Sequence, residues 1–368
     1  MKVEVSPTSI KSALNTIKIV KPIFGDYSLT IKRDRFIFSS YDKRRSVVAV
    51  VNIDDQGKDL DEEFFISIDR ASIFESDLGS LSFSINDKGL NIKHHGNGIT
   101  KTALLKRRAV GSKRPSSPGI PSVTSTHSIT QSDMESMLKS ASCSALVKES
   151  HTEEDMKVNQ IHFYSKHKSI YSNARYYASC IYNDHISFDA SIVSADIPII
   201  RFFSTRCDEQ VQVNNEGDKL VLLDPKNQVY LSISGISIKK PDFVDLKVGE
   251  SKHDLIISSD SWKQSIKWAV LTLEGTQRIS MSVVTNEGSS ELKLLNGDMT
   301  LSSYPVINRA SDFASDFPLK VLLSISEYLS DGELRILFGV SGMPDVMVLE
   351  QNINGTKAHH FIRSMKSK

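Results

Sequence analysis

The sequence is poor in the features that mark secreted, disulfide-rich or membrane-embedded proteins. Three cysteines among 368 residues are too few and too scattered for a disulfide framework or a structural zinc site. No segment approaches the roughly 18 consecutive apolar residues that a membrane span needs. The amino terminus also lacks an apolar core of signal-peptide length. These absences predict a reduced, soluble, cytoplasmic protein with no membrane partner.

Catalytic signatures are missing as well. The sequence contains no GxxxxGK(S/T) phosphate loop, no HExxH zinc motif and no GxSxG nucleophile elbow. The adjacent pairs His94-His95 and His359-His360 would point to opposite faces of a strand, so we expect solvent-exposed loop histidines instead of metal ligands. The sequence therefore predicts no metal, no cofactor and no catalytic residue, with an enzyme of unrecognised type as a minor alternative.

Acidic residues are absent from one long stretch. Between Lys88 and Gln131 the chain has eight basic residues and no Asp or Glu, although the whole chain has 45 basic and 44 acidic residues. A basic strip on a mildly acidic body suggests contact with a polyanion. A solvated basic connector between domains explains the strip equally well. The role of segment 101–114 stays open between these two interpretations.

Three amphipathic helical patterns recur at a regular spacing. They cover residues 7–21, 132–148 and 259–274, each with apolar residues at i, i+3, i+4 and i+7 positions. Ile10, Met134 and Trp262 occupy equivalent positions, with intervals of 124 and 128 residues. The chain is about three intervals long, which indicates an internal threefold repeat.

A second helical pattern recurs inside each repeat. It covers residues 69–78, 194–206 and 316–329, and its starting residues are 125 and 122 residues apart. Between the helices lie segments in which apolar and polar residues alternate and β-branched residues are common, such as YSLTIKRDRFIFSS. This pattern is typical of strands. Each repeat therefore reads helix, strands, helix, strands, and the fold class is α+β with antiparallel sheets.

Two segments have the composition of linkers. Residues 111–122 are rich in Pro, Gly and Ser, and a second linker is placed at 239–250. These segments predict three domains, at residues 1–115, 120–240 and 250–368.

The six predicted helices carry a net charge of only +1, but five acids at helix starts account for much of the acidic charge. These acids are Asp69, Asp133, Asp196, Asp260 and Asp316, and the helix dipole favours them whatever the function. Without them the helices carry +6. Such faces suit diffuse contact with phosphates, although ordinary solvated helix faces have the same composition.

Repeats of this length, each a doubled helix-and-strand unit, resemble the bacterial three-domain type of DNA sliding clamp. The segment FPLKVLLSISEYLSDGELRILFGVSGMPDVMVLEQ is similar to the terminal module of such clamps. The resemblance implies three clamp-type domains, each with two helices packed on antiparallel sheets, arranged as a half ring. The local amino-acid sequence diverges from that of bacterial clamps, so a phage-encoded clamp fits at least as well as a cellular one.

The resemblance implies a function and a set of partners. The protein would be a non-enzymatic processivity factor that encircles double-stranded DNA without sequence preference, as a head-to-tail homodimer. It would tether a replicative DNA polymerase and be opened by an ATP-driven clamp loader, in the cytoplasm of a bacterium or an infected host cell. The alternative function is a viral structural or assembly protein built from repeated β-rich modules.

The resemblance also assigns candidate residues. The DNA-binding candidates are the basic residues of the helices and of the basic strip: Lys11, Lys18, Lys21, Arg70, Lys139, Lys148, Arg201, Arg206, Lys263, Lys267, Lys320, Lys106, Arg107 and Arg108. A partner-peptide pocket between the second and third domains would use Phe243, Val244, Leu246, Phe361, Ile362 and Met365. Packing of these apolar residues within their own domain is the alternative. The chain departs from bacterial clamps in its basic tail, HHFIRSMKSK.

Overall fold

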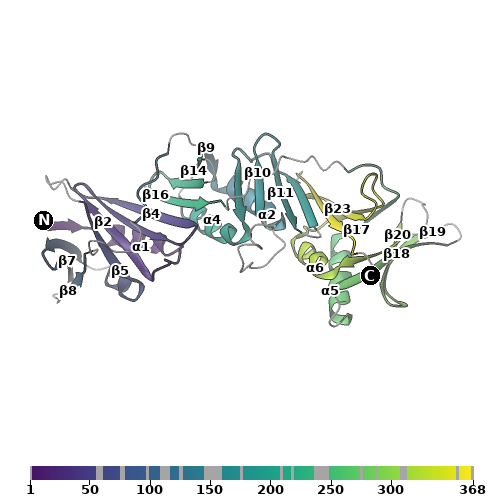
Figure 1. The fold of residues 1–368 in the computed structure, drawn as a ribbon, viewed down its shortest axis with the longest axis horizontal. Coiled ribbons are helices and arrows are strands. Elements are labelled where there is room, and N and C mark those ends of the chain that lie inside the picture. Colours follow the sequence, from purple (N-terminus) through teal and green to yellow (C-terminus); the bar gives the residue numbers. More distant parts are fainter. Residues whose placement is uncertain are drawn as a thin grey trace. The chain divides into compact units, whose positions relative to one another are not determined.

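The computed structural model describes most of the chain. The described residues are 2–54, 61–74, 79–96, 99–107, 117–123, 127–144, 160–174, 177–207, 210–216, 219–235, 248–273, 277–286, 289–306, 313–353 and 356–365. They form two compact units: unit 1 comprises residues 1–134 and 198–235, and unit 2 comprises residues 135–197 and 236–368. Each unit contains one eight-stranded and one four-stranded antiparallel sheet (Figure 1).

The order of secondary-structure elements repeats three times. Within the described residues, each repeat, which we call a module, has one strand, a helix, four strands, a second helical segment and three strands. Module 1 consists of β1 (Lys2–Val5), α1 (Pro7–Ile17), β2 (Asp26–Lys32), β3 (Arg35–Tyr41), β4 (Arg45–Asn52), β5 (Asp61–Ser67), the 3-10 helix η1 (Ile68–Phe74), β6 (Ser80–Asn86), β7 (Gly89–Gly96) and β8 (Ile99–Leu105).

Module 2 repeats this order after a linker. It consists of β9 (His127–Thr130), α2 (Gln131–Ser144), β10 (Gln160–Tyr164), β11 (Ser169–Ala174), β12 (Tyr177–Tyr182), β13 (Ala190–Val193), η2 (Ser194–Asp196) with α4 (Ile197–Ser204), β14 (Gln210–Glu216), β15 (Lys219–Asp224) and β16 (Val229–Ser234).

Module 3 repeats the order once more. It consists of β17 (His253–Ser258), α5 (Ser259–Thr272), β18 (Arg278–Asn286), β19 (Ser289–Asn296), β20 (Met299–Val306), β21 (Phe313–Pro318), α6 (Leu319–Tyr328), β22 (Glu333–Phe338), β23 (Val346–Ile353) and β24 (Thr356–Arg363).

Strand pairing is the same in every module. In module 1 the first strand and the last three form the order β1-β6-β7-β8, and the four central strands form β5-β2-β3-β4. Module 2 repeats these orders as β9-β14-β15-β16 and β13-β10-β11-β12. Module 3 repeats them as β17-β22-β23-β24 and β21-β18-β19-β20. The shared strand order confirms the threefold repeat and the α+β fold class that the sequence predicted.

Successive modules join through the edges of these four-stranded sheets. β4 of module 1 pairs with β16 of module 2, for example Val47 opposite Leu231. β12 of module 2 pairs with β24 of module 3, for example Cys180 opposite His359. Module 2 thus contributes four strands to the eight-stranded sheet of each compact unit. The domain boundaries at 1–115, 120–240 and 250–368 remain predictions.

The helices bury the apolar stripes that their periodicity predicted. In unit 1, α1 contacts β3 and β4 and has Ile10 and Leu14 fully buried. In unit 2, α5 and α6 contact each other (Figure 1), and Trp262, Ile266 and Leu322 are fully buried in one core. Burial of each such side chain contributes about 1.5–3 kcal/mol.

The second helical segments differ from the sequence prediction in two modules. Residues 68–74 form a 3-10 helix instead of an α-helix over 69–78, of which residues 75–78 lie outside the described part. The predicted helix start at Asp316 is wrong, because β21 runs through Pro318 and α6 begins at Leu319. Asp316 lies 3.2 Å from the Arg278 guanidinium and accepts a hydrogen bond from Ser280 Oγ at 2.6 Å. It is therefore a strand residue that holds β18 and not a helix-start acid.

Candidate nucleic-acid interface and partner surfaces

Most of the predicted DNA-binding cations lie on the helices or directly after them. Those with exposed side chains on or after the helices are Lys18, Lys21, Lys139, Arg206, Lys267 and Lys320. Lys11 of α1 and Arg201 of α4 are half-buried, and Arg70 lies in η1. Lys148 and Arg108 fall outside the described residues. Cations therefore lie on the helices or directly after them in all three modules, and their role in DNA binding stays a prediction.

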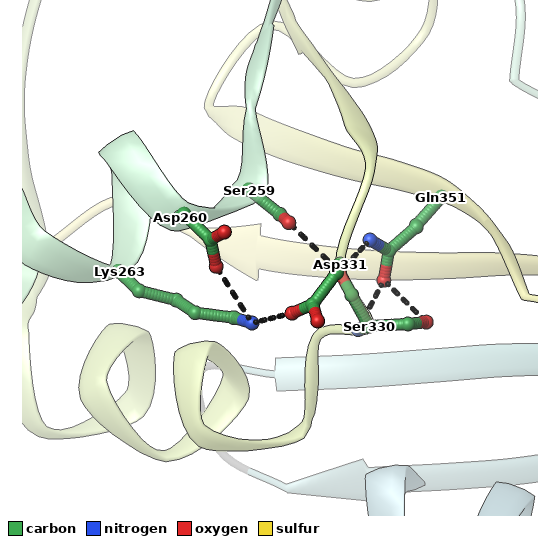
Figure 2. A network of polar contacts seen from close by, with 6 residues as sticks. All are labelled: Ser259, Asp260, Lys263, Ser330, Asp331 and Gln351. Carbon is green, nitrogen blue, oxygen red and sulfur yellow. Dashed lines mark hydrogen bonds and ion pairs between the residues drawn. The ribbon is translucent and has the colours of Figure 1, made fainter.

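Lys263 of α5 differs from its neighbour Lys267 because two carboxylates hold its charge (Figure 2). Its Nζ lies 3.1 Å from Asp331 Oδ1 and 3.3 Å from Asp260 Oδ1. Burial lowers the pKa of Lys263, but the hydrogen bonds to Asp331 and Asp260 more than compensate, and the net result is a raised pKa. Lys263 consequently offers a phosphate less net charge than the sequence analysis assumed.

The surrounding contacts tie the turn after α6 to the start of α5 (Figure 2). Ser259 Oγ donates a hydrogen bond to the Ser330 carbonyl at 2.8 Å. The Ser330 N–H donates to Gln351 Oε1 at 2.9 Å, and Gln351 Nε2 donates back to the Ser330 carbonyl at 2.6 Å. These bonds satisfy polar groups at a helix end, which would otherwise need water. Lys263 therefore stands in a structural network of module 3.

The described basic residues of the strip lie on or beside strands β7 and β8 of unit 1. Lys101 lies in β8, and Lys106 and Arg107 follow it with exposed side chains. Arg107 Nε lies 3.0 Å from Glu62 Oε2, and its backbone bridges Phe64 of β5. These contacts anchor the end of β8, while residues 108–116 lie outside the described part.

The structure corrects part of the predicted peptide pocket. Ile362 is fully buried in the main core of module 3, because alternation along β24 turns its side chain toward the helices. It cannot contact a peptide from solution. Met365 is half-buried, and its N–H donates to the Asp316 carbonyl at 2.8 Å. Phe243, Val244 and Leu246 lie outside the described residues.

Phe361, next to Ile362, belongs to a separate apolar cluster. Its ring is 5% exposed and packs with buried residues of β22 and β23 and the turn between them. Partly buried apolar side chains surround this cluster; they are Ala178, Val248, Met343 and Val346. Sequence reasoning missed these four residues, because they lie on different strands and turns and only strand pairing brings them together.

Strands β8 and β20 are among those that lie at the ends of their sheets. β8 is an end strand of the four-stranded sheet of unit 1, and β20 is an end strand of the four-stranded sheet of unit 2. Each exposes a large apolar side chain, Leu104 (41% exposed) and Met299 (54% exposed). Edge strands offer backbone N–H and C=O groups for pairing with another chain.

The neighbourhood of β20 is hollowed and partly apolar. A groove of about 530 Å³ lies between α5 and β20 and is lined by Trp268, Tyr304 and small polar residues. The Tyr304 hydroxyl donates to the Ser261 carbonyl at 3.1 Å, and burial raises the pKa of Tyr304 despite its hydrogen bonds with Ser265 and Ser302. Trp268 is 55% exposed and Leu271, one turn further along α5, is 71% exposed. The sequence analysis did not single out this surface.

The histidine pairs were wrongly predicted as exposed loop residues. His94 and His95 lie on β7, and His359 and His360 lie on β24. His360 is 2% exposed, and its Nδ1 lies 2.9 Å from the Tyr177 hydroxyl. Burial, followed by the neighbouring His359, lowers the pKa of His360 to about 4. The sequence pattern did not reveal that these histidines lie on paired strands, where neighbouring strands cover their side chains.

Among the described residues, no group of three or more His, Cys, Asp or Glu side chains is placed to hold a metal ion. Both Cys180 and Cys207 are buried, and the Cys207 thiol donates a hydrogen bond to the Phe203 carbonyl at 3.4 Å. In the same part of the chain, no helix is long and apolar enough to cross a membrane.

The strand order and its threefold repetition define a sliding-clamp fold. Along its whole length the chain resembles solved β subunits of bacterial DNA polymerase III. A DNA polymerase sliding clamp from Caulobacter crescentus matches with a TM-score of 0.75 at 13% identity, and a second Caulobacter crescentus pol III β structure with 0.74 at 14%. The β subunit from Streptococcus pyogenes matches with a TM-score of 0.71 at 13% identity. In all three comparisons the alignment covers 100% of both chains. No family model and no curated protein matches the sequence.

Proposed function

We propose that this protein is a DNA polymerase processivity factor: a sliding clamp that closes as a ring around duplex DNA and tethers a replicative polymerase. The observation that carries the proposal is the module architecture, repeated three times and matched over the whole length of bacterial clamps. A clamp holds DNA topologically, so it needs no catalytic group of its own. A protein in this role works where DNA is replicated, in a bacterial or infected host cell, and an ATP-driven loader opens it.

The rule that joins modules within the chain predicts how two chains join. In chain order, the third of the four central strands of one module pairs with the last strand of the next: β4 with β16, and β12 with β24. Continuing the rule, β20 of module 3 pairs with β8 of module 1 in a second copy. This contact is heterologous, and two copies joined head to tail close into a ring of six modules.

The exposed apolar residues support this junction. Leu104 on β8 and Met299 on β20 lie on the strands that the rule pairs, and α5, which contacts β20, exposes Trp268 and Leu271. Burying such residues would favour association by about 25 cal/mol for each Å² of apolar surface. The groove between α5 and β20 would receive side chains of the partner's module 1.

Contact with DNA would be diffuse. The exposed helix cations, with Lys18, Lys139, Lys267 and Lys320 among them, would attract phosphates without reading bases. A moderate number of such contacts lets a clamp slide. Lys263 would contribute less than the others because Asp260 and Asp331 already hold its charge.

The partner-peptide site would lie over the cluster around Phe361. Val248, Met343 and Val346 would line it in place of Ile362, since their side chains are only partly buried. An apolar polymerase peptide would cover them.

A retention assay tests the proposal. Subunits diluted to the monomeric state are mixed with a nicked circular plasmid and concentrated, so that rings assemble around the DNA. We expect the protein to remain with the circle through gel filtration and to be lost once a restriction enzyme linearises the plasmid. Equal retention on both forms, or on neither, would contradict the clamp assignment and favour an assembly protein.

Matched variants test the junction. Leu271→Asp should convert the dimer to monomer in sedimentation analysis and abolish retention on the circle. Phe24→Asp removes an apolar side chain of module 1 that is 44% exposed and should leave both unchanged. Loss of the dimer in both variants, or in neither, would reject the proposed interface.

A further inference from the structure

The end of α4 carries an exposed aromatic ring next to two arginines. Phe202 is 41% exposed, and the guanidinium carbon of Arg206 lies 4.1 Å from the centroid of its ring. Arg206 itself is exposed, and Arg201 lies one residue before Phe202 on the same helix. All three belong to unit 1.

This arrangement is fixed by the local backbone. Phe203 and Ile200 are buried on the opposite side of α4, with 2% and 3% exposure, and anchor the helix in the core. After the helix ends, the Thr205 N–H donates to the Arg201 carbonyl at 3.0 Å, and the Arg206 N–H donates to the Phe203 carbonyl at 3.1 Å. The turn therefore holds Arg206 over the ring of Phe202 before any ligand arrives.

A flat aromatic ring in this setting has a specific chemical use. In duplex DNA the bases are stacked inside the helix, and a side chain facing the backbone meets phosphates only. Unpaired bases expose their faces, and they stack on Phe, Tyr, Trp or on a guanidinium. The remaining exposed surface of Phe202 can take one base, while the exposed guanidinium of Arg206 lies close enough to attract its phosphate.

We propose that Phe202, Arg206 and Arg201 form a binding surface for single-stranded DNA, separate in its chemistry from the diffuse phosphate contacts of the other helix cations. This inference rests on the proposed function and specifies it, because a polymerase clamp works where a single-stranded template meets the primed duplex. The surface would hold unpaired template next to that junction without preference for sequence, since every base has a face to stack.

Fluorescence anisotropy with a labelled dT20 oligonucleotide and with a labelled 20-bp duplex tests the proposal on the full-length protein. At low salt, Phe202→Leu should weaken binding of dT20 about five- to tenfold and leave duplex binding within about twofold, in line with the usual contribution of one stacked base. Phe202→Trp should restore dT20 binding. Arg206→Gln should weaken both ligands and lower the salt dependence by about one phosphate contact.

Tyr328→Leu is the matched control, because it removes an aromatic side chain of similar exposure (38%) from α6. It should leave dT20 binding unchanged. The proposal is overturned if the wild-type protein does not bind dT20, or if Phe202→Leu and Tyr328→Leu behave alike. Retention of the same preparation on circular duplex plasmid shows that such a failure concerns the single-strand surface alone and leaves the clamp assignment standing.

Discussion

Modules 1 and 3 share one strand order but build their second helical segment differently. In module 3, α6 is an α-helix of ten residues that buries Leu319, Leu322 and Ile325. In module 1, η1 is a 3-10 helix of seven residues that buries Ala71 and Phe74. The sheets on either side have the same topology in both modules. Strand pairing therefore defines the module, and the second helix need only cover the apolar face of the sheet.

The two modules also differ in how they use lysine. α1 has no acidic residue in its first turn, and Lys18 at its end is exposed. α5 begins with Asp260, which together with Asp331 holds Lys263. A count of basic residues therefore overstates the positive charge that module 3 can offer to DNA.

The largest expected effect is a loss of stability in module 3, where α5 and α6 share a core. Leu322→Ala should lower the free energy of unfolding by about 2–5 kcal/mol, because it leaves a cavity in the core that α5 and α6 share. Urea denaturation followed by circular dichroism measures the loss. Leu323→Ala is the matched control: Leu323 is only partly buried and should cost clearly less. Equal losses would mean that the helix face is assigned incorrectly.

The next effect is a pH dependence that module 3 contributes through His360. Burial depresses the pKa of His360 in the folded protein to about 4, below the ordinary value of 6.5. The unfolded chain therefore binds the proton first, and stability falls as pH decreases from about 6.5 to about 4, by about 3 kcal/mol at most. Urea denaturation at pH 7, 6 and 5 should show this decline.

Two variants separate His360 from other titrating groups. His360→Gln should remove most of the decline, whatever its stability at pH 7. Tyr177→Phe keeps the imidazole and should retain the decline even if the lost hydroxyl lowers overall stability. An unchanged slope in His360→Gln would assign the pH dependence to other residues.

These contrasts show which features local sequence could predict. The spacing of apolar residues along α1 and α5 involves only residues close in sequence. The helices and their buried faces could therefore be predicted from periodicity. For η1, the interval between Ala71 and Phe74 suits a 3-10 helix as well as an α-helix, and the pattern could not separate them. Domain-level repetition was visible for the same reason, since two independent helices recur at one interval.

Features that depend on pairing between distant strands were not predictable. Alternation along β24 shows that Phe361 and Ile362 lie on opposite faces, but not which face is the core. The β4–β16 junction brings together residues from different modules, and no local pattern encodes it. One partner of Lys263 escaped prediction similarly, because Asp331 is distant in sequence and meets it only through the turn after α6.

A smaller expected effect is on duplex affinity, and it tests whether the lysines of α1 and α5 offer different amounts of positive charge to DNA. Changing Lys11, Lys18 and Lys267 to Gln should weaken duplex binding about tenfold at moderate salt, which corresponds to about 1.4 kcal/mol, and should lower the salt dependence by up to about three phosphate contacts. Fluorescence anisotropy across a salt series measures both quantities. Lys263→Gln alone should change the salt dependence less than Lys267→Gln alone, and the reverse order would contradict the structural role of Lys263.

The smallest effect comes from releasing Lys263. Asp331→Asn removes one carboxylate from the Lys263 ammonium but keeps the size of the side chain. Asp331 is 88% exposed, so the loss of stability should be below about 1 kcal/mol. The freed charge should raise duplex affinity by less than threefold, and the gain should disappear in Asp331→Asn combined with Lys263→Gln. If the double variant keeps the gain, the effect arises from the lost negative charge of Asp331 and not from Lys263, and modules 1 and 3 then differ in acidic residues alone.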